Sequence, residues 1–329
     1  MGGDKAPRQI VRGCVDAAHG LDTVDAIIMV GDEAAIATEL KLYKALNTPK
    51  LSVVHTTQVI GMDEHPAQAI RAKKDSSMNR GIELLKEGKA DAFVSAGNTG
   101  ALVASAVLGL RRIPGVKRPA LGTVFPTLNF RRPLFILDVG ATPDCTEVEL
   151  EQFAIMGSIY SNTILRQEKP HVGLLSIGTE DFKGNDITKK TFEVLSKLDS
   201  IEFKGNVEGH DLFEGHTDVV VTDGFVGNVV LKTTESVART IGHWMKHEFT
   251  CGPIRMLGAL CLSGAMLSMK KKMDPELYGG APLLGINGTV IKTHGSSKKK
   301  AIYHAIRVGA EAVNARINAQ IAENLKKTL

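Results

Sequence analysis

The stretch Ser95-Ala96-Gly97-Asn98-Thr99-Gly100 joins an apolar, strand-like run at 92–94 to a helix-like run at 101–108. A strand, a glycine turn and a helix in this order form the repeating unit of α/β folds. The turn places backbone N–H groups, the Asn98 amide and the Thr99 hydroxyl at a helix N-terminus, where the macrodipole favours an anion. We therefore predict a phosphate-binding turn that includes Gly97 and Gly100. The alternative is a turn whose glycines only satisfy backbone geometry.

Two further turns repeat this order of strand, polar glycine turn and helix. They contribute these candidate binding residues: Asp223, Gly224, Gly227 and Asn228 after the run 218–221, and Gly178, Glu180, Lys183 and Asn185 after the run 172–177. In open α/β sheets ligands bind beyond the carboxyl ends of strands, so we expect the three turns to converge on one site. None matches the G-x-G-x-x-G or G-x-x-x-x-G-K-[ST] pattern, so a nucleotide is not the first expected ligand.

The composition is that of a soluble globular protein: 329 residues, 43% hydrophobic and 23% charged. The net charge of +4 comes without a dense Lys/Arg stripe interleaved with aromatics, so no nucleic-acid partner is expected and acidic small molecules or an acidic protein fit better. Four widely spaced cysteines suggest a reduced, cytosolic protein. The start has no signal-peptide pattern, and no apolar stretch reaches the roughly 18 residues of a spanning helix.

Short strand-like runs alternate with helical patterns along the chain. We expect strands at 26–30, 51–55, 92–94, 134–139, 172–177, 201–203, 219–221 and 289–291, and helices at 68–73, 79–86, 147–160, 188–198 and 227–249. This alternation predicts a three-layer α/β fold, a mostly parallel sheet with helices on both faces. No linker marks a boundary, so we expect one domain over 1–329, with two interleaved lobes as an alternative.

Residues 256–269 break this pattern, because they carry no charge and are flanked by Arg255 and by three lysines at 270–272. A run of this length is typical of a buried core helix, which we favour. A helix lying on anionic lipid or a dimer interface would have the same composition. We therefore define residues 251–273 as an apolar helical segment that contacts either a second subunit or the membrane surface.

Cationic and hydroxyl side chains precede another expected helix start. Lys73, Lys74, Ser76 and Ser77 would hold a phosphate there, whereas the simpler interpretation is a solvated turn with Ser77 as N-cap. His294 ends the strand at 289–291 in a polar glycine turn and is a candidate acid or base, although a lone histidine is commonly structural.

Four carboxylates lie at turns: Asp138, Glu180, Asp211 and Asp223. Each is a candidate for proton chemistry or for helix capping, and the sequence does not decide between these roles. No H-E-x-x-H pattern, His/Cys cluster or G-x-S-x-G elbow occurs. We therefore expect neither a metal site nor a covalent serine mechanism.

Eleven motifs, in order along the whole chain, resemble those of the PlsX family of bacterial phosphate acyltransferases. They are MGGDKAP (1–7), RAKKDSSM (71–78), SAGNTGAL (95–102), RPAL (118–121), LDVGA (137–141), QFAIMGSIY (152–160), IGTEDFKGN (177–185), GNVEGHDL (205–212), TDGFVGNVVLKT (222–233), YGGAPLLGINGTVIKTHGSS (278–297) and AIYHAIR (301–307).

The resemblance implies transfer of a fatty acyl group from acyl carrier protein to inorganic phosphate, which yields acyl phosphate for phospholipid synthesis. It also implies a fold similar to phosphate acetyltransferases and isocitrate or isopropylmalate dehydrogenases, a homodimer without cofactor or metal, and a place in the cytoplasm or at the inner membrane surface. A membrane glycerol-3-phosphate acyltransferase that uses acyl phosphate is a further implied partner. The alternatives are a coenzyme A-dependent short-chain phosphate acyltransferase and a non-enzymatic membrane-surface scaffold.

The mechanism expected from this resemblance is direct attack of phosphate on the thioester carbonyl. Main-chain N–H groups, Lys73, Lys74, Asn98 and Thr99 would hold the phosphate and stabilise the oxyanion. Because a thiol has a pKa near ~8.5, the thiolate leaves readily and His294 is expected to be dispensable.

Two departures from the family pattern stand out. Relatives usually have a β-strand before Met-Gly-Gly-Asp, whereas this chain starts at that motif. We therefore expect a truncated start or an absent strand, with unpaired sheet edges. In addition, Thr142-Pro143 follows Ala141 where the family commonly has Asn, so we expect this loop to be a weaker ligand contact.

Overall fold

Runs of branched and aromatic residues form the strands of an eight-stranded sheet in the computed structural model, which describes residues 1–272 and 275–328. In spatial order the strands are β3 (Ala92–Ser95), β10 (Thr289–Lys292), β9 (Ala281–Leu284), β4 (Ala120–Phe125), β5 (Leu134–Leu137), β8 (Val219–Val221), β6 (His171–Leu175) and β7 (Glu202–Val207). A separate parallel pair consists of β1 (Ile27–Gly31) and β2 (Leu51–His55). The expected strands are present, and β4 and β9 are additional.

Side-chain N-caps start six of the described helices around the sheet, and the capping residues are Asp32, Ser76, Asn98, Thr146, Asn185 and Asp223. The helices are α1 (Arg8–Gly20), α2 (Glu33–Leu42), α3 (Pro66–Ala72), α4 (Ser77–Lys86), α5 (Thr99–Leu110), α6 (Glu147–Thr163), α7 (Asp186–Leu195), α8 (Gly224–Thr250), α9 (Pro253–Cys261), α10 (Ser263–Lys272), α11 (Lys299–Asn314) and α12 (Ile317–Thr328). Two 3-10 turns are η1 (Asp211–Phe213) and η2 (Pro275–Tyr278).

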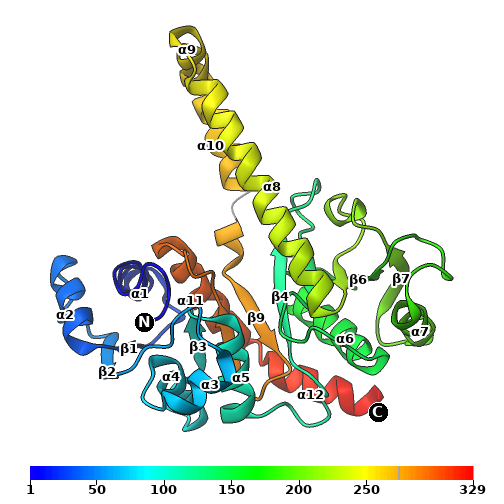
Figure 1. Ribbon diagram of the computed structural model, residues 1–329, viewed down its shortest axis with the longest axis horizontal. Coiled ribbons are helices and arrows are strands. Elements are labelled where there is room, and N and C mark those ends of the chain that lie inside the picture. Colours follow the sequence, from blue (N-terminus) through cyan, green and yellow to red (C-terminus); the bar gives the residue numbers. More distant parts are fainter. Residues whose placement is uncertain (273–274, 329) are drawn as a thin grey trace.

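Alternating residues of the central strands enter two different cores. Val219 and Val221 pack with α6 and α12, whereas Val220 belongs to the core that contains residues of α3, α4 and α5. Because β5 and β8 are buried at every position, both sheet faces are covered. The predicted three-layer α/β fold with helices on both faces is therefore confirmed, and the ribbon has two lobes joined by this sheet (Figure 1).

The strand directions divide the sheet into two halves. β3 and β10 are parallel, and β5, β8, β6 and β7 are parallel to one another. Between them β9 and β4 pair antiparallel with each other and with their outer neighbours. Two parallel halves joined in this way run in opposite directions, so their carboxyl ends lie at opposite edges of the sheet.

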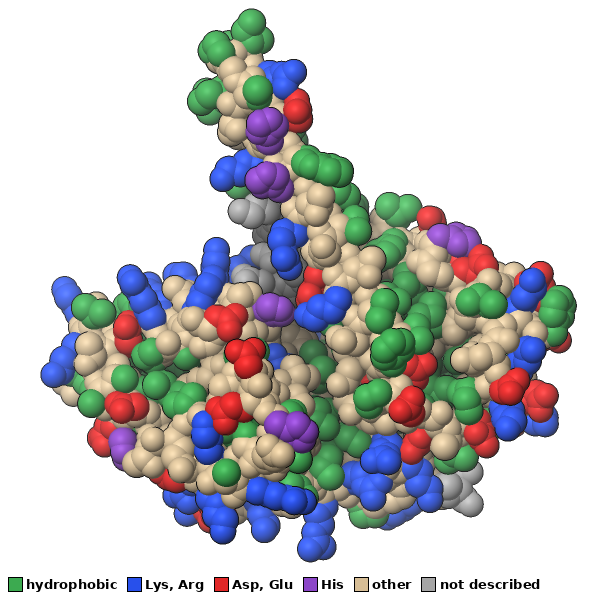
Figure 2. Space-filling model, in the orientation of Figure 1, with side chains coloured by type: hydrophobic (Ala, Val, Ile, Leu, Met, Phe, Trp, Pro, Cys, Tyr) green, Lys and Arg blue, Asp and Glu red, His purple; other side chains and the backbone are tan. Residues whose placement is uncertain are grey.

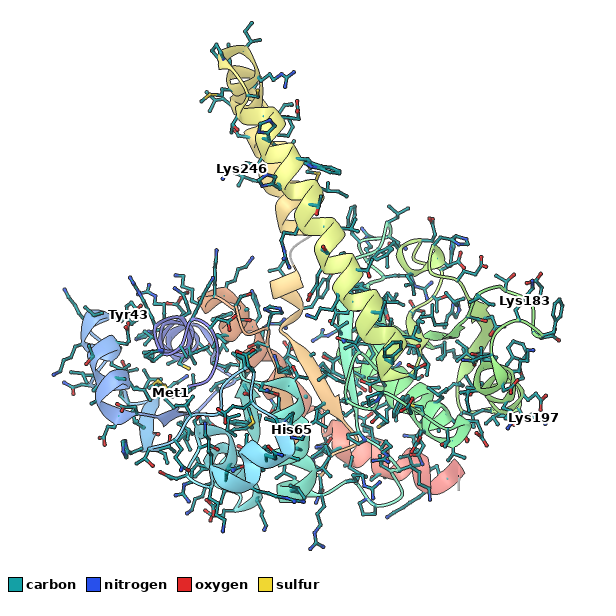
Figure 3. All side chains as sticks on the ribbon, in the orientation of Figure 1. Met1, Tyr43, His65, Lys183, Lys197 and Lys246 are labelled. Carbon is teal, nitrogen blue, oxygen red and sulfur yellow. The ribbon has the colours of Figure 1, made fainter. Side chains whose placement is uncertain are left out.

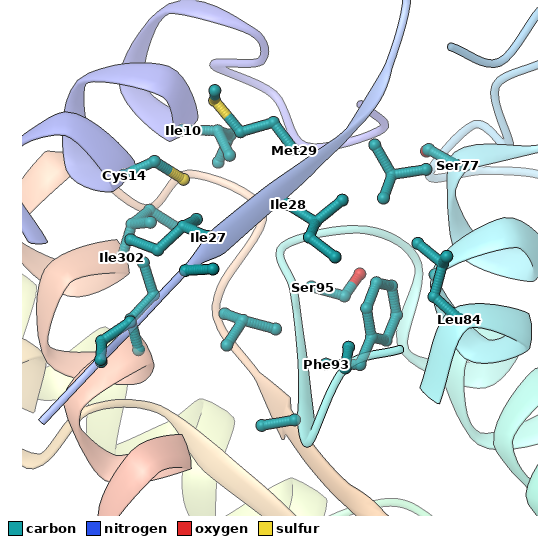
Figure 4. A pocket seen from close by; sticks show the side chains of 18 of the residues that line it. Ile10, Cys14, Ile27, Ile28, Met29, Ser77, Leu84, Phe93, Ser95 and Ile302 are labelled. Carbon is teal, nitrogen blue, oxygen red and sulfur yellow. The ribbon is translucent and has the colours of Figure 1, made fainter. Parts of the chain in front are cut away.

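Two of the unpaired strand edges in the described part of the chain face one another. β1 pairs only with β2, and β3 only with β10. A cavity of about 380 Å³ separates these edges, with Ile28 and Met29 on one side and Phe93 and Ser95 on the other (Figure 4).

Helices α8, α9 and α10 form a projecting arm (Figure 1). No residue of α9 is buried, and Ile254, Leu257 and Leu260 are 85%, 65% and 70% exposed. The favoured prediction of a buried core helix at 256–269 is therefore wrong, because no layer of the protein covers this segment. Met273 of the 251–273 segment, like the side chains at 270–272, lies outside the described residues. In the described residues no helix combines the length and apolarity needed to cross a bilayer.

Candidate functional site

The residues of the turn after β3 contact the start of α5 and the 61–66 loop. Asn98 caps α5 by accepting a hydrogen bond from the Ala101 N–H at 3.0 Å, and its amide donates to the carbonyls of Met62 (2.8 Å) and Glu64 (3.2 Å). Gly100 packs so closely on Pro66 that a Cβ would lie 2.7 Å from its ring. Thr99 is the first residue of α5 and is half-buried. The Asn98 side chain is thus used to bind the 61–66 loop, and the backbone around Gly97 and Thr99 is what the turn offers to a ligand.

The cations at 73–74 do not form one cluster with this turn. Lys73 Nζ makes an ion pair with Glu64 at 2.6 Å and donates to the Val59 carbonyl at 2.7 Å, which fastens the same loop from its other side. Lys74 is exposed. Ser76, rather than Ser77, is the N-cap of α4, and Ser77 is its buried first residue. Lys73 therefore holds the 59–66 loop, whereas Ser76 and Ser77 start α4.

A buried lysine that the sequence interpretation missed ends β10. Lys292 is 7% exposed, and its Nζ donates to the carbonyl of Thr293. Within residues 1–272 and 275–328 it makes no ion pair of 4 Å or less. Burial and the neighbouring Lys232 lower its pKa to about 8, against the raising effect of Asp4 and Glu235. The alternation of Val290 and Lys292 on one face of β10 was the available signal, because it places the ammonium inside the protein.

His294 lies beside this lysine in the turn after β10. Its Nδ1 accepts the Ser296 N–H at 3.1 Å and lies 2.8 Å from the Ser296 hydroxyl, so the ring proton sits on Nε2. Burial lowers the pKa of the imidazole, and Lys232 and Lys292 lower it further against Glu235 and Asp4. At neutral pH the ring is therefore a neutral Nε2–H donor.

Four segments meet around these two residues, and we name them together the β10 site. They are the N-terminal loop with Asp4, the turn after β3, the turn 292–297, and the face of α8 with the Lys232–Glu235 pair. The Asp4 N–H bonds the Gly295 carbonyl at 2.9 Å, and the Thr293 N–H bonds the Ser95 carbonyl at 2.8 Å. Three of the recognised motifs thus converge with α8 on a buried ammonium.

A second cluster lies at the opposite sheet edge, after β5 and β8. The Asp138 carboxylate is fully buried and accepts from the backbone N–H groups of Leu121, Gly140, Ala141 and Thr142 at 2.6 to 3.1 Å. Burial raises its pKa to about 6, against these donors, which lower it. Asp138 and Thr142 therefore fix this loop.

Helix α8 starts against this loop. Asp223 caps it by accepting the Val226 N–H at 2.8 Å. A Cβ on Gly224 would lie 2.6 Å from the Asp138 carboxylate, and one on Gly227 would overlap the Asp138 carbonyl oxygen. Asn228 is exposed beside Gly140. Close packing thus explains both glycines, which we had predicted as binding residues.

The third turn lies farther away, after β6. Asn185 caps α7, Lys183 lies over the Phe182 ring, Gly178 is buried, and the Glu180 carbonyl accepts from Asn206 at 2.7 Å. Lys183 lies at the right-hand end of the molecule, whereas His65, the N-cap of α3, lies near its middle (Figure 3). The expectation that all three turns converge is wrong, because β6 and β8 end at the sheet edge opposite to β3.

Asp211 lies at a separate corner. It accepts the Glu208 N–H at 3.0 Å, and His210 lies 3.2 Å from its carboxylate. These three side chains are close enough for a cation, and no second feature points to one. Asp211 is therefore a local turn-forming residue in this structure.

Comparison with known proteins agrees with these motifs. A family model described as "Fatty acid synthesis protein" matches residues 1–320. The phosphate acyltransferase of Dictyoglomus turgidum is 45% identical over 327 residues, 99% of this chain and 96% of that protein. The one of Desulfitobacterium hafniense is 47% identical over 328 residues, with the same coverage. The chain belongs to this family. These are the PlsX phosphate acyltransferases that the eleven motifs indicated, and the protein is an acyltransferase of fatty acid and phospholipid synthesis.

Solved structures give the fold independently of sequence. A phosphotransacetylase from Streptococcus pyogenes matches 92% of this chain and 91% of that chain, with a TM-score of 0.64 at 17% identity. A branched-chain phosphotransacylase from Enterococcus faecalis matches 95% and 96%, with a TM-score of 0.57 at 13% identity. At these identities the likeness concerns the fold, and the expected similarity to phosphate acetyltransferases is confirmed.

Proposed function

We propose that this PlsX-family enzyme transfers a fatty acyl group from acyl carrier protein to inorganic phosphate, and that the phosphate binds in the β10 site. The observation that carries the placement is the buried Lys292 ammonium. A buried charge without a carboxylate partner is costly, and an anion beside it removes much of that cost. Phosphate is the anionic substrate of this family of enzymes, and the turn after β3 offers N–H groups at the α5 N-terminus beside it.

The reaction then needs little covalent help from the protein. A phosphate oxygen forms a bond to the thioester carbonyl carbon, and the C–S bond breaks as the electron pair leaves on the thiolate. In this proposal Lys292 and Lys232 hold the phosphate, and the Nε2–H of His294, in the same turn as Lys292, donates to the carbonyl oxygen or the sulfur. Because a thiolate leaves without strong acid catalysis, His294 contributes less than Lys292.

The donor is tested by measuring acyl-phosphate formation from acyl carrier protein and coenzyme A thioesters of the same chain length. We expect kcat/KM to be higher with the carrier protein, since the mildly basic chain suits an acidic protein. A clear preference for coenzyme A with short chains would instead support the coenzyme A-dependent alternative.

We also propose that the arm touches the membrane surface, where acyl phosphate would pass to a membrane glycerol-3-phosphate acyltransferase. Hydrophobic side chains cover its free end (Figure 2), and basic Arg239, Lys246 and Arg255 accompany them. Apolar residues with basic neighbours suit an anionic lipid surface. A cytoplasmic homodimer in which the arms of two subunits pack together is the alternative contact.

Making the arm tip polar tests this contact. In the variant Ile254→Ser/Leu257→Ser/Leu260→Ser we expect binding to anionic liposomes to fall by about tenfold or more, because three large apolar side chains lose their transfer free energy. Sedimentation with liposomes measures it. The control Leu42→Ser/Leu108→Ser alters side chains that are 66% and 63% exposed elsewhere. Equal sedimentation of both variants and the unmodified protein would exclude lipid contact through the tip.

A further inference from the structure

The amine of Lys292 is buried but borders exposed groups. Lys232 lowers its pKa and His294 feels its charge, and both of these side chains are exposed. The Lys292 Nζ donates to the Thr293 carbonyl, and no carboxylate of the described chain forms an ion pair with it. The amine is therefore held in one place at the edge of the β10 site, without a counter-charge in contact.

Four titratable groups lie around this amine. Lys232 and Glu235 belong to α8, Asp4 to the N-terminal loop and His294 to the turn after β10. The neighbouring strands β3 and β9 and helix α5 contain no charged residue. Helix α11 packs on the opposite face of β10, through Ile291. The amine thus faces two carboxylates that only act from a distance, one further lysine and one histidine.

These surroundings make Lys292 a nucleophile. Burial and Lys232 lower its pKa to about 8, whereas Asp4 and Glu235 raise it. At pH 7 about a tenth of the side chains then carry the neutral amine, against about four in ten thousand for an ordinary lysine. Only the neutral amine has the free electron pair that can attack a carbonyl carbon.

The product of the proposed reaction is an acylating agent beside this amine. The phosphate oxygen held at Lys292 becomes bonded to the acyl carbonyl carbon, so the carbonyl group stays close to Nζ. An acyl phosphate is a mixed anhydride, from which phosphate leaves readily when an amine attacks. Holding the amine and the carbonyl in one site raises the rate further.

We propose that Lys292 is a self-acylation site, at which acyl phosphate that has not left the enzyme transfers its acyl group to Nζ. This inference rests on the proposed function, because it needs phosphate to bind at Lys292. Nζ forms a bond to the carbonyl carbon, the C–O bond to phosphate breaks, and its electron pair and the surplus Nζ proton leave with the phosphate. The amide carries no charge, so the modified enzyme no longer holds phosphate. Accumulated product thereby stops its own formation.

The test is to incubate the whole protein, in a buffer without phosphate, with synthetic octanoyl phosphate and to locate the acyl group by peptide mass spectrometry. We expect one acyl group per chain, on Lys292, at a rate about tenfold or more above that of exposed lysines. The rate should rise up to about pH 8 and level off above it, as the amine becomes neutral. Inorganic phosphate should slow the labelling of Lys292, and this measurement needs no variant.

Two variants complete the test. Lys292→Arg keeps the charge, but a guanidinium stays protonated and is not acylated. Its activity should therefore survive incubation with octanoyl phosphate, whereas the unmodified enzyme should lose activity as Lys292 is labelled. The control Lys326→Arg makes the same change at an exposed position of α12 and should leave the labelling of Lys292 unchanged.

Two results would overturn the self-acylation site. One is labelling of exposed lysines without preference for Lys292, and the other is labelling of Lys292 that inorganic phosphate does not slow. Failure of the proposed function looks different, because the unmodified enzyme would then form no acyl phosphate from acyl carrier protein and phosphate. The labelling experiment supplies the acyl phosphate ready made, so the two failures are seen separately.

Discussion

Replacing Lys292 with methionine is expected to lower kcat/KM for phosphate by about a hundredfold, the effect of removing a charge-assisted hydrogen bond from a buried site. The KM for the acyl donor should change little, because the ammonium holds the other substrate. Initial rates at varied phosphate and saturating donor measure this. Methionine keeps the unbranched shape of the side chain, so packing around β10 is preserved.

The pH profile separates charge from shape at the same position. Since the pKa of Lys292 is lowered to about 8, the ammonium loses its proton above that pH and phosphate binding weakens as pH rises. We expect kcat/KM for phosphate to fall above pH 8 in the unmodified enzyme. Lys292→Arg keeps its charge and should lose this alkaline limb. An identical limb in the arginine variant would assign the titration to another group.

Replacing Gly227 with alanine is expected to lower the free energy of unfolding by about 3 kcal/mol or more, because the new Cβ overlaps the Asp138 carbonyl oxygen and must displace backbone. The start of α8 and the loop held by Asp138 would move apart. Denaturant unfolding followed by circular dichroism measures the change.

The same helix offers a control. Nothing lies within 4 Å of a Cβ placed on Gly242, in the exposed upper part of α8. Gly242→Ala should therefore stabilise the protein by about 0.5–1 kcal/mol through helix propensity alone. Equal stability of the two variants would contradict the packing role given to Gly227.

Much of the fold follows from local sequence. The runs 51–55 and 219–221 are strands with the expected bounds, because β-branched residues and turn signals mark them clearly. β4 and β9 escaped notice, since Gly122 interrupts one and the other is four residues long with Pro282. These two strands reverse the direction of half the sheet. Strand direction depends on pairing between distant segments, so the meeting of the turns could not be read from their motifs.

The site was predictable in part. The polar glycine turns after β3 and β10 were each recognised from the sequence, but their contact through the Thr293–Ser95 hydrogen bond was not predicted. Asn98 and Lys73 bind the 59–66 loop because this loop folds back against them. No local sequence pattern predicts that the loop folds back. Lys292 was overlooked because a lysine at a strand end normally faces solvent. Similarly, the apolar composition of residues 256–269 did not show whether other helices or strands of the protein bury this segment.

The placement of phosphate beside Lys292 is tested most directly by calorimetric titration of inorganic phosphate, without acyl donor, into the unmodified protein and the Lys292→Met variant at pH 7. The account predicts saturable binding to the unmodified protein and binding at least about tenfold weaker in the variant. Equal affinity of the two proteins for phosphate would contradict it, and would place the nucleophile at the other sheet edge or outside both sites.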